Sequence, residues 1–398
     1  DFTMTERLLT EPRVILFYLS LLLYPINSRL TFLHDIDISR SLLIPWTTIP
    51  AILLLFVIIG IALSQARKRP LVSFCVLFFF LNHLIEGSIL PLELIYEHRN
   101  YIPSMLLFVP LAEFIIFTIN YFSYKQIIQF AVAFGVVILI FGLGDVTYRR
   151  NFIFSNSLLL WMDNIDKYPQ LSRPYSNLGN VYLLQNHKDK ALYYYKKALE
   201  LNNFANTHIK ALQEYNLGVY YYYEGQYDLA LPYLDRAYAS HPSYLMTAVY
   251  KANILLLNGE HDSAHALIEP LARMHPESTR LNELFCLILF KEKKFSEAGD
   301  HARNFLRKNL FSTFPLPILA EIARKKGNVA SSISFWKLYQ QNFPLDFLTN
   351  LALIELAAEI NDFSLLDIEL ARLYCFKTNQ NLTKYINKIS NQKNLLVY

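Results

Sequence analysis

Small residues recur at a fixed spacing along the middle of this chain, and that spacing constrains the fold more than any other feature. The glycine, alanine and proline pairs that are 34 residues apart are Gly225 and Gly259, Ala230 and Ala264, and Pro242 and Pro276, with Ala298 one step further along the alanine series. A fixed step of this length is typical of stacked copies of one supersecondary unit. The chain is therefore expected to contain a repeat array, in which each unit is stabilised by its neighbours.

The residue types indicate which unit is repeated. Two antiparallel helices approach closely where side chains are small, and large side chains fill the remaining gaps. The small positions are Gly179, Gly218, Ala191, Ala198, Ala230 and Ala237, and the large ones are Leu178, Tyr182 and Tyr195. Gly225 is expected at the turn between the helices, and Pro242 after the second helix. With the 34-residue step, this pattern predicts tetratricopeptide repeats.

The repeats are expected to cover residues 149–378, about six in number. The outlying signals are Trp161 and Pro169 for a divergent first unit, Gly327, Trp336 and Pro344 for a second register, and residues 351–374 for a degenerate last pair. Residues 379–398 are expected to form a polar capping helix or tail. One apolar face of that helix would contain Leu382, Tyr385, Ile386 and Ile389.

The N-terminal part has a different composition. The chain is 53% hydrophobic and only 18% charged, and residues 1–148 hold most of the long apolar runs. Five runs are candidate membrane spans, at residues 14–26, 46–63, 71–90, 105–119 and 127–143. A span needs about 20 apolar residues, so the first run could instead be re-entrant or interfacial. The predicted fold class is all-α, a multi-span transmembrane domain followed by a repeat solenoid.

Basic residues predict the orientation of these spans. The turns expected in the cytoplasm contain Arg67, Lys68, Arg69 and Lys125, and Arg7 and Arg13 agree with a cytoplasmic start. After five crossings the repeats would lie in the periplasm of a bacterium, or in a eukaryotic lumen. Arg149 and Arg150 on the outer side depart from this rule.

The loops expected on the outer side, residues 27–41 and 91–104, contain the candidate chemistry. Arg40 and Arg99 are possible partners for a lipid-linked phosphate, with a carboxylate as base. The alternative is that these are ordinary headgroup-level residues. Within the third run, His83 and Glu86 are three residues apart and share a helix face. They are either functional or a satisfied contact between helices.

The inner helices of the repeats are expected to form a groove for an extended peptide. Its candidate residues are Arg173, Asn180, Tyr215, Tyr222, Asn253 and Arg280. The alternative is that these side chains are simply solvated. The cysteine spacing predicts no metal site, and the net charge of +4 without a basic stripe argues against a nucleic-acid partner.

The stretch 81–104 ends in Glu97-His98-Arg99-Asn100-Tyr101-Ile102-Pro103-Ser104. With the spans and the repeats, it resembles the transmembrane and tetratricopeptide-repeat family related to protein O-mannosyltransferases, most of all its bacterial members. The resemblance implies a C-type glycosyltransferase membrane fold, a polyprenyl-phosphate sugar as donor, no further cofactor, and repeats that hold an exported acceptor protein. It also implies that Glu97, His98, Arg99 and Tyr101 line the donor site.

The same resemblance implies that something is missing. The catalytic acid of such enzymes lies in the first outer loop, and this chain, which opens at Asp1, is expected to be the C-terminal part of a larger protein without that acid. Asp35 and Asp37 lie in a later loop and do not take its role. Two functions therefore stay open: part of a membrane glycosyltransferase, or a non-catalytic membrane-anchored scaffold. Sugar transfer lost on Arg99→Ala would favour the first, and a partner lost on changing groove residues the second.

Overall fold

The computed structural model describes residues 2–87, 94–201, 207–309, 312–344 and 346–374. All regular structure in these ranges is helical, which confirms the expected all-α class. The chain forms two compact units, Asp1–Leu217 and Gly218–Tyr398. The boundary falls inside a repeat helix, and the first repeat groups with the N-terminal helices. The predicted domain boundary at residue 148 stays a prediction, and the predicted capping helix at 379–398 lies outside the described residues.

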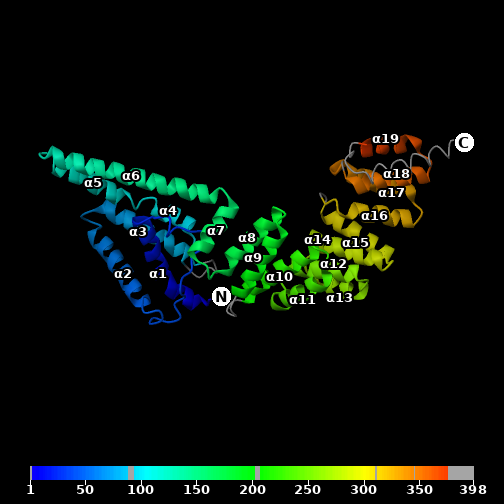
Figure 1. Ribbon diagram of the computed structural model, residues 1–398, viewed down its shortest axis with the longest axis horizontal. Helices are drawn as coiled ribbons and strands as arrows, with labels where there is room; N and C mark the ends of the chain where they lie inside the picture. Colours follow the sequence, from blue (N-terminus) through cyan, green and yellow to red (C-terminus); the bar gives the residue numbers. More distant parts are fainter. Residues whose placement is uncertain (1, 88–93, 202–206, 310–311, 345, 375–398) are drawn as a thin grey trace. The chain divides into compact units, whose positions relative to one another are not determined.

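The first unit contains the apolar helices and the first repeat (Figure 1). Its helices are α1 (Met4–Leu23), α2 (Thr48–Gln65), α3 (Pro70–Glu86), η1 (Glu97–Asn100), α4 (Tyr101–Ser104), α5 (Val109–Tyr121), α6 (Gln126–Phe154), α7 (Ser157–Lys167), α8 (Ser172–Leu184), α9 (Lys188–Leu201) and most of α10 (Thr207–Tyr223). Among the described helices, α2 and α6 are long and apolar enough to cross a membrane. The pair from η1 to α5, bent by 54°, is either a third, broken span or a re-entrant loop. The prediction that the last four apolar runs cross the membrane stays a prediction.

Helix α1, which contains the first apolar run, is not among these candidates because its N-terminal half is charged. The segment after α1 turns back alongside it. Arg13 Nη1 donates to the Asp37 carbonyl oxygen at 2.6 Å, and the Ser39 backbone N–H donates to Thr10 Oγ1 at 2.8 Å. Arg13 therefore lies against residues 27–41. The prediction that placed Arg13 and this loop on opposite sides of a membrane is wrong, and the geometry favours the re-entrant or interfacial alternative.

The second unit continues the repeats. Its helices after α10 are α11 (Tyr227–Ser240), α12 (Leu245–Leu257), α13 (His261–Met274), α14 (Thr279–Lys291), α15 (Phe295–Lys308), α16 (Pro315–Lys325), α17 (Val329–Asn342), α18 (Phe347–Glu359) and α19 (Phe363–Tyr374). The small residues act as expected. A Cβ added to Gly218 would lie 2.7 Å from the Leu234 side chain, and one added to Gly179 would lie 2.7 Å from the Tyr195 ring. Each glycine thus lets two helices of a pair approach closely.

The turn inside each pair is made by one residue with positive φ. In the second unit these residues are Gly225, Gly259, Lys293, Gly327 and Asn361, with φ of 71°, 81°, 62°, 76° and 56°. Each is 34 residues after the one before, so a single register runs through the unit. The predicted second register at Gly327 and Pro344 is wrong, because both continue the first one.

Burial of one histidine in this unit leads to an expected dependence of stability on pH. His301 Nε2 lies 2.9 Å from Asn282 Oδ1, its ring packs edge-on against Phe285 at 5.0 Å, and burial lowers the pKa of His301 from 6.5. The unfolded chain binds a proton at His301 more readily than the folded chain, because the pKa of His301 is higher when the chain is unfolded. Burial of the neutral ring therefore contributes fully to stability above pH 6.5, and this contribution is lost as the pH falls through the lower pKa of the folded state.

We expect His301→Gln, which keeps an N–H donor for Asn282, to reduce the loss of stability on acidification. Urea midpoints of both proteins at about pH 7.5 and 5.5 measure it. An equal loss in both would contradict the expectation.

Candidate functional site

The two predicted outer loops meet the first repeat in the first unit. Glu97 Oε1 accepts from the Thr31 backbone N–H at 2.7 Å and lies 2.8 Å from His34 Nε2. The His34 side chain is 1% exposed, and its Nδ1 lies 3.4 Å from the Tyr168 hydroxyl. Burial, with the nearby carboxylates of Asp35 and Glu97, raises the pKa of Tyr168. A predicted donor-site carboxylate is therefore engaged by side chains and backbone of the protein itself.

Helix α7 also forms hydrogen bonds with the loop that contains Thr31. Asn164 Nδ2 donates to Thr31 Oγ1 at 2.5 Å, and Lys167 Nζ donates to the Leu30 carbonyl oxygen at 2.6 Å. The Phe32 ring packs among the rings of Tyr96, Phe154 and Trp161. We use the name junction for residues 30–35, Glu97 and those residues of 161–170 that contact them. These hydrogen bonds and the aromatic contacts of Phe32 hold α7 against the loop.

The other predicted donor-site residues are spread around this junction. The Arg99 guanidinium lies 4.9 Å from the centre of the Tyr96 ring, and the His98 ring lies 5.1 Å from it. Tyr101 is 78% exposed at the start of α4. Arg40 is exposed. Hydrogen bonds from Thr3 lower the pKa of the Glu6 carboxyl at the start of α1, and the charge of Arg40 adds a smaller lowering. Arg40 and Arg99 have Glu6 and Tyr96 as neighbours, and the predicted phosphate site stays a prediction.

The His83 side chain on α3 contacts residues of other elements in the first unit. Its Nε2 lies 3.3 Å from Asn100 Oδ1, and its ring stacks on Tyr18 and packs edge-on against Phe79. The residue is only 4% exposed. This geometry fits the alternative of a satisfied contact between helices. The side chain of Glu86 lies outside the described part of the structure, so its pairing with His83 stays a prediction.

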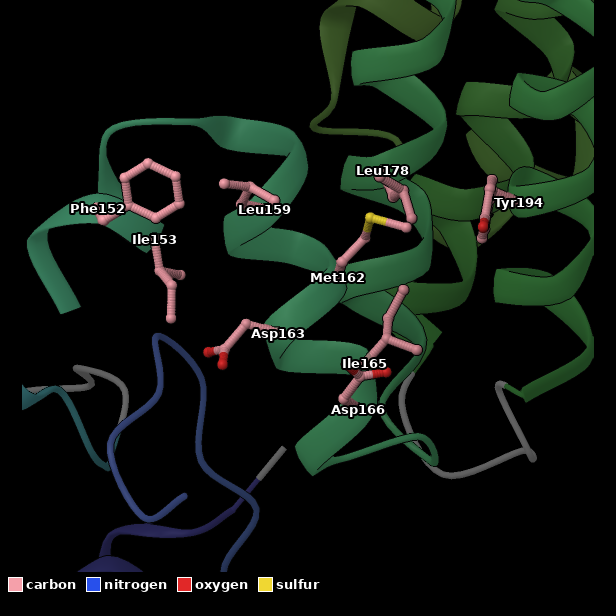
Figure 2. Close-up of a pocket in the computed structure, with 9 residues that line it drawn as sticks. All are labelled: Phe152, Ile153, Leu159, Met162, Asp163, Ile165, Asp166, Leu178 and Tyr194. Atoms are coloured by element: carbon pink, nitrogen blue, oxygen red, sulfur yellow. The ribbon is translucent and has the colours of Figure 1, made fainter. Parts of the chain in front are cut away.

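A pocket of about 470 Å³ opens beside α7, which sequence reasoning did not find. Figure 2 shows its lining, which comes from α6, α7, α8 and α9: Phe152, Ile153, Leu159, Met162, Asp163, Ile165, Asp166, Leu178 and Tyr194. Asp163 is bound by Arg150 Nη1 and Lys167 Nζ, each at 2.7 Å. The acidic residues of α7 were the available signal, but only the packing of four helices reveals that they border a pocket.

Four tyrosines gather in the second unit, and we call Tyr222, Tyr223, Tyr227 and Tyr250 the tyrosine cluster. The hydroxyls of Tyr223 and Tyr250 are 3.0 Å apart, and the Tyr222 ring lies 5.1 Å from that of Tyr250. Burial and the Tyr223 hydrogen bond raise the pKa of Tyr250, whereas nearby Arg280 opposes this rise. Tyr223 nevertheless stays 64% exposed. The cluster thus offers aromatic surface that is partly fixed by its own contacts.

Comparison with known families identifies the repeats. Two models of the tetratricopeptide repeat match this chain, at residues 172–203 and 221–284. The chain carries tetratricopeptide repeats. No curated protein matches it in sequence.

Solved structures with a similar fold include Pseudomonas aeruginosa PilF, a type IV pilus biogenesis factor called PilW, and a tetratricopeptide repeat protein from Parabacteroides merdae. PilF has 19% identity and a TM-score of 0.44, with 55% of this chain and 97% of PilF covered. PilW has 15% identity and a TM-score of 0.47, with 54% of this chain and 98% of PilW covered. The Parabacteroides protein has 12% identity and a TM-score of 0.48, with 61% of this chain and 96% of that protein covered.

The predicted groove residues have different environments in these tetratricopeptide repeats. In the second unit, Tyr222 and Arg280 both approach Tyr250, and Asn253 is half-buried on the same helix as Tyr250. In the first unit, Asn180 Oδ1 accepts from the Tyr195 hydroxyl at 2.6 Å, so Asn180 joins the two helices of its own repeat. Arg173 and Tyr215 are half-buried. Among the described residues, no group of three or more His, Cys, Asp or Glu could hold a metal ion.

Proposed function

We propose that this chain is a membrane-anchored scaffold whose repeats bind an extended segment of a protein partner at the tyrosine cluster. The observation that carries the proposal is the cluster itself. Its rings come from α10, α11 and α12, and Tyr223 is largely exposed although its hydroxyl is held by Tyr250. Tyrosines fixed in this way lose little entropy on binding and are enriched among the residues that dominate interface energies. Repeat arrays use such extended surfaces to bind proteins.

The membrane part of the proposal depends on exposed apolar side chains. Helix α6 is 29 residues long, and Phe130, Phe134 and Phe141 are each more than half exposed. Apolar surface on a helix of this length favours a lipid environment. The basic turn at residues 67–69 and Lys125 support a cytoplasmic location for those turns, and hence repeats on the outer face of a bacterial inner membrane, able to meet exported proteins.

Sugar transfer from a polyprenyl-phosphate donor is the finer function that the resemblance implies, and it stays a prediction. Its candidate carboxylate, Glu97, is held by Thr31 and His34. Its candidate phosphate partners, Arg40 and Arg99, have different neighbours, Glu6 and Tyr96. We therefore base the proposed function on the repeats.

We expect Tyr250→Ala to weaken partner binding by about tenfold or more, because it removes a fixed aromatic ring and the support of Tyr223. A photo-crosslinking amino acid at Tyr223 would first capture the partner in native membranes, and mass spectrometry would identify the joined segment. The affinity of that synthetic segment is then measured with the full chain in lipid discs.

The matched control is Tyr193→Ala, which removes a tyrosine on α9 that is 61% exposed and outside the tyrosine cluster. Its affinity for the segment should equal that of the unchanged protein. Equal affinity of the Tyr250→Ala protein would refute the proposal.

A further inference from the structure

We propose that the turn between α2 and α3 binds anionic phospholipids, with the lipid phosphate at Arg67, Lys68 and Arg69 and the acyl chains along the two helices. This surface rests on the membrane part of the proposed function, but not on the tyrosine cluster or its partner. It would make the protein select one class of lipid from those that surround its apolar helices.

Three consecutive cations form the centre of this surface. The side chains of Arg67, Lys68 and Arg69 are all exposed, and in the described part of the chain none of them forms an ion pair. The two helices that the turn joins contain one further Lys, Arg, Asp or Glu, which is Glu86. Glu86 is the last residue of α3, about 24 Å along the helix from Pro70. Neither helix therefore compensates the positive charge of the turn.

Helix α5, which packs against α3, contributes one carboxylate. Glu113 lies within electrostatic range of the Cys75 thiol of α3. Arg69 is six residues before Cys75, and Tyr121 is eight residues after Glu113. Helix α3 therefore begins about 9 Å, and α5 ends about 12 Å, from this point along the helices. Figure 1 shows the turns at these two helix ends on the side away from α4.

The turn after α5 adds a fourth cation at this level. Lys125 Nζ lies 5.6 Å from the centre of the Tyr124 ring, and Tyr124 is 70% exposed. Exposed tyrosines at the ends of apolar helices are typical of the headgroup level of a membrane. With four cations in the two turns and Glu113 as the one nearby carboxylate, the charge remains positive even if Glu113 offsets one cation.

Apolar side chains beside the α2–α3 turn match the rest of a phospholipid. Ile61 of α2 and Leu71 and Phe74 of α3 are each at least half exposed. Hydrocarbon can cover these side chains without burying any unsatisfied backbone group, which a polypeptide could do only as a helix or barrel. The surface thus has cations at headgroup level and apolar side chains at acyl-chain level.

The cations distinguish between the classes of phospholipid. Phosphatidylcholine balances its phosphate with a choline cation, whereas phosphatidylglycerol has a net negative charge. A Lys or Arg near an anionic membrane surface contributes about fivefold in affinity. Three such residues in one turn therefore favour phosphatidylglycerol.

Native mass spectrometry of the full chain in nonionic detergent tests this preference, with dioleoyl phosphatidylglycerol and dioleoyl phosphatidylcholine added at equal concentration. We expect phosphatidylglycerol to bind about tenfold more tightly or better. The triple variant Arg67→Gln, Lys68→Gln, Arg69→Gln should lose most of this preference. Arg67→Lys with Arg69→Lys should keep it, because the charge is unchanged. Raising ammonium acetate from about 50 to 500 mM should weaken phosphatidylglycerol binding.

The matched control is the triple variant Lys291→Gln, Lys325→Gln, Lys326→Gln, which removes three exposed cations of the second unit. It changes the net charge equally and should keep the preference. Circular dichroism melts verify that each variant folds.

Flotation of the reconstituted chain with pure phosphatidylcholine vesicles separates this proposal from the proposed function. A chain that does not float would refute the membrane part of the proposed function and this surface with it. A chain that floats but binds both lipids equally, or whose Arg67, Lys68 and Arg69 variant keeps the preference, would overturn this surface alone. Displacement of phosphatidylglycerol by inorganic phosphate at constant ionic strength would also overturn it, because the turn would then bind free phosphate.

Discussion

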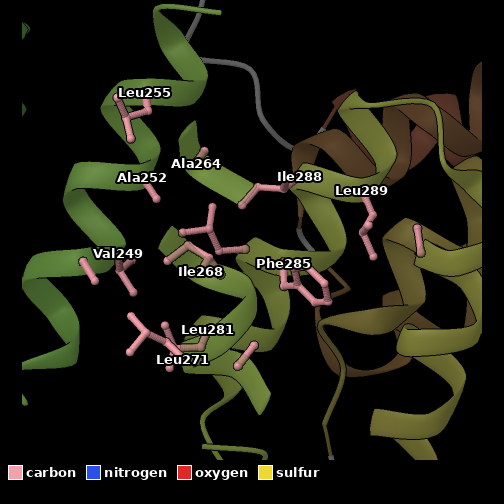
Figure 3. Close-up of a cluster of buried hydrophobic side chains, with 14 of the residues drawn as sticks. Val249, Ala252, Leu255, Ala264, Ile268, Leu271, Leu281, Phe285, Ile288 and Leu289 are labelled. Atoms are coloured by element: carbon pink, nitrogen blue, oxygen red, sulfur yellow. The ribbon is translucent and has the colours of Figure 1, made fainter. Parts of the chain in front are cut away.

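Replacing Ile268 with alanine is expected to lower the free energy of unfolding of the second unit by about 2–5 kcal/mol. Ile268 is 0% exposed and belongs to the cluster of buried side chains that joins α12, α13 and α14. Figure 3 shows it on α13, between Val249 and Ala252 of α12 and Phe285 of α14. Alanine would leave a cavity that three helices, each packed on further neighbours, could only partly close.

Chemical denaturation followed by circular dichroism, on the full chain in mild detergent, measures this loss. Leu229→Ala on α11 is the matched control, because Leu229 is 52% exposed and its truncation should change stability by no more than about 0.5 kcal/mol. Hydrogen exchange should locate the effect. Since repeats are stabilised by nearest neighbours, protection should fall in α12 to α14 more than in α18 and α19. Equal losses for Ile268→Ala and Leu229→Ala would contradict this account.

The sequence predicts the repeats because their packing requirement is local and periodic. Gly225 and Gly259 reveal the turn, but the series continues at Lys293, Gly327 and Asn361, and two of these three are not glycine. Asparagine adopts positive φ more easily than most residues, and lysine adopts it at a modest energetic cost. The residue types therefore hide a conformational period that the backbone keeps, and Gly327 is misread as the start of another register.

Hydropathy could not predict the course of the chain around α1. It identifies the apolar run at residues 14–26, but the partners that decide where the polar half of α1 lies come from the returning segment. Arg13 donates to a backbone carbonyl of Asp37, and Thr10 accepts from the backbone of Ser39. Contacts made by backbone groups of a loop leave no signal in residue type.

In the candidate sites, too, the sequence predicts single residues, whereas only the fold reveals their partners. Glu97 was predicted from a local motif, but its partner His34 is 63 residues away and was not paired with it. Tyr222 was predicted from the repeat register, whereas Tyr223 and Tyr250 become important only because α10 and α12 bring their hydroxyls together. The pocket requires four helices at once and has no local signature.

Replacing Arg7 with methionine is expected to cost about 3–5 kcal/mol, because it leaves the carboxylate of Glu11 buried without its cation. Arg7 Nη2 lies 3.0 Å from Glu11 Oε1, and the two side chains are 2% and 10% exposed. Taking both charges out of water is itself costly, so the pair as a whole contributes far less than either single loss suggests. The double variant Arg7→Met with Glu11→Leu should therefore recover most of the stability lost in the single variant.

Asp145 and Arg149 provide a control with the same i,i+4 spacing, since this pair on α6 is 2.8 Å apart but 56% and 65% exposed. Arg149→Met should cost no more than about 1 kcal/mol, because solvent screens an exposed pair. Thermal unfolding of all four proteins in the same detergent compares the costs. If the double variant were as unstable as Arg7→Met alone, the loss would come from the packing of the arginine stem rather than from the uncompensated charge. Recovery in the double variant, with no more than a small effect at Arg149, would assign the cost to the buried carboxylate of Glu11.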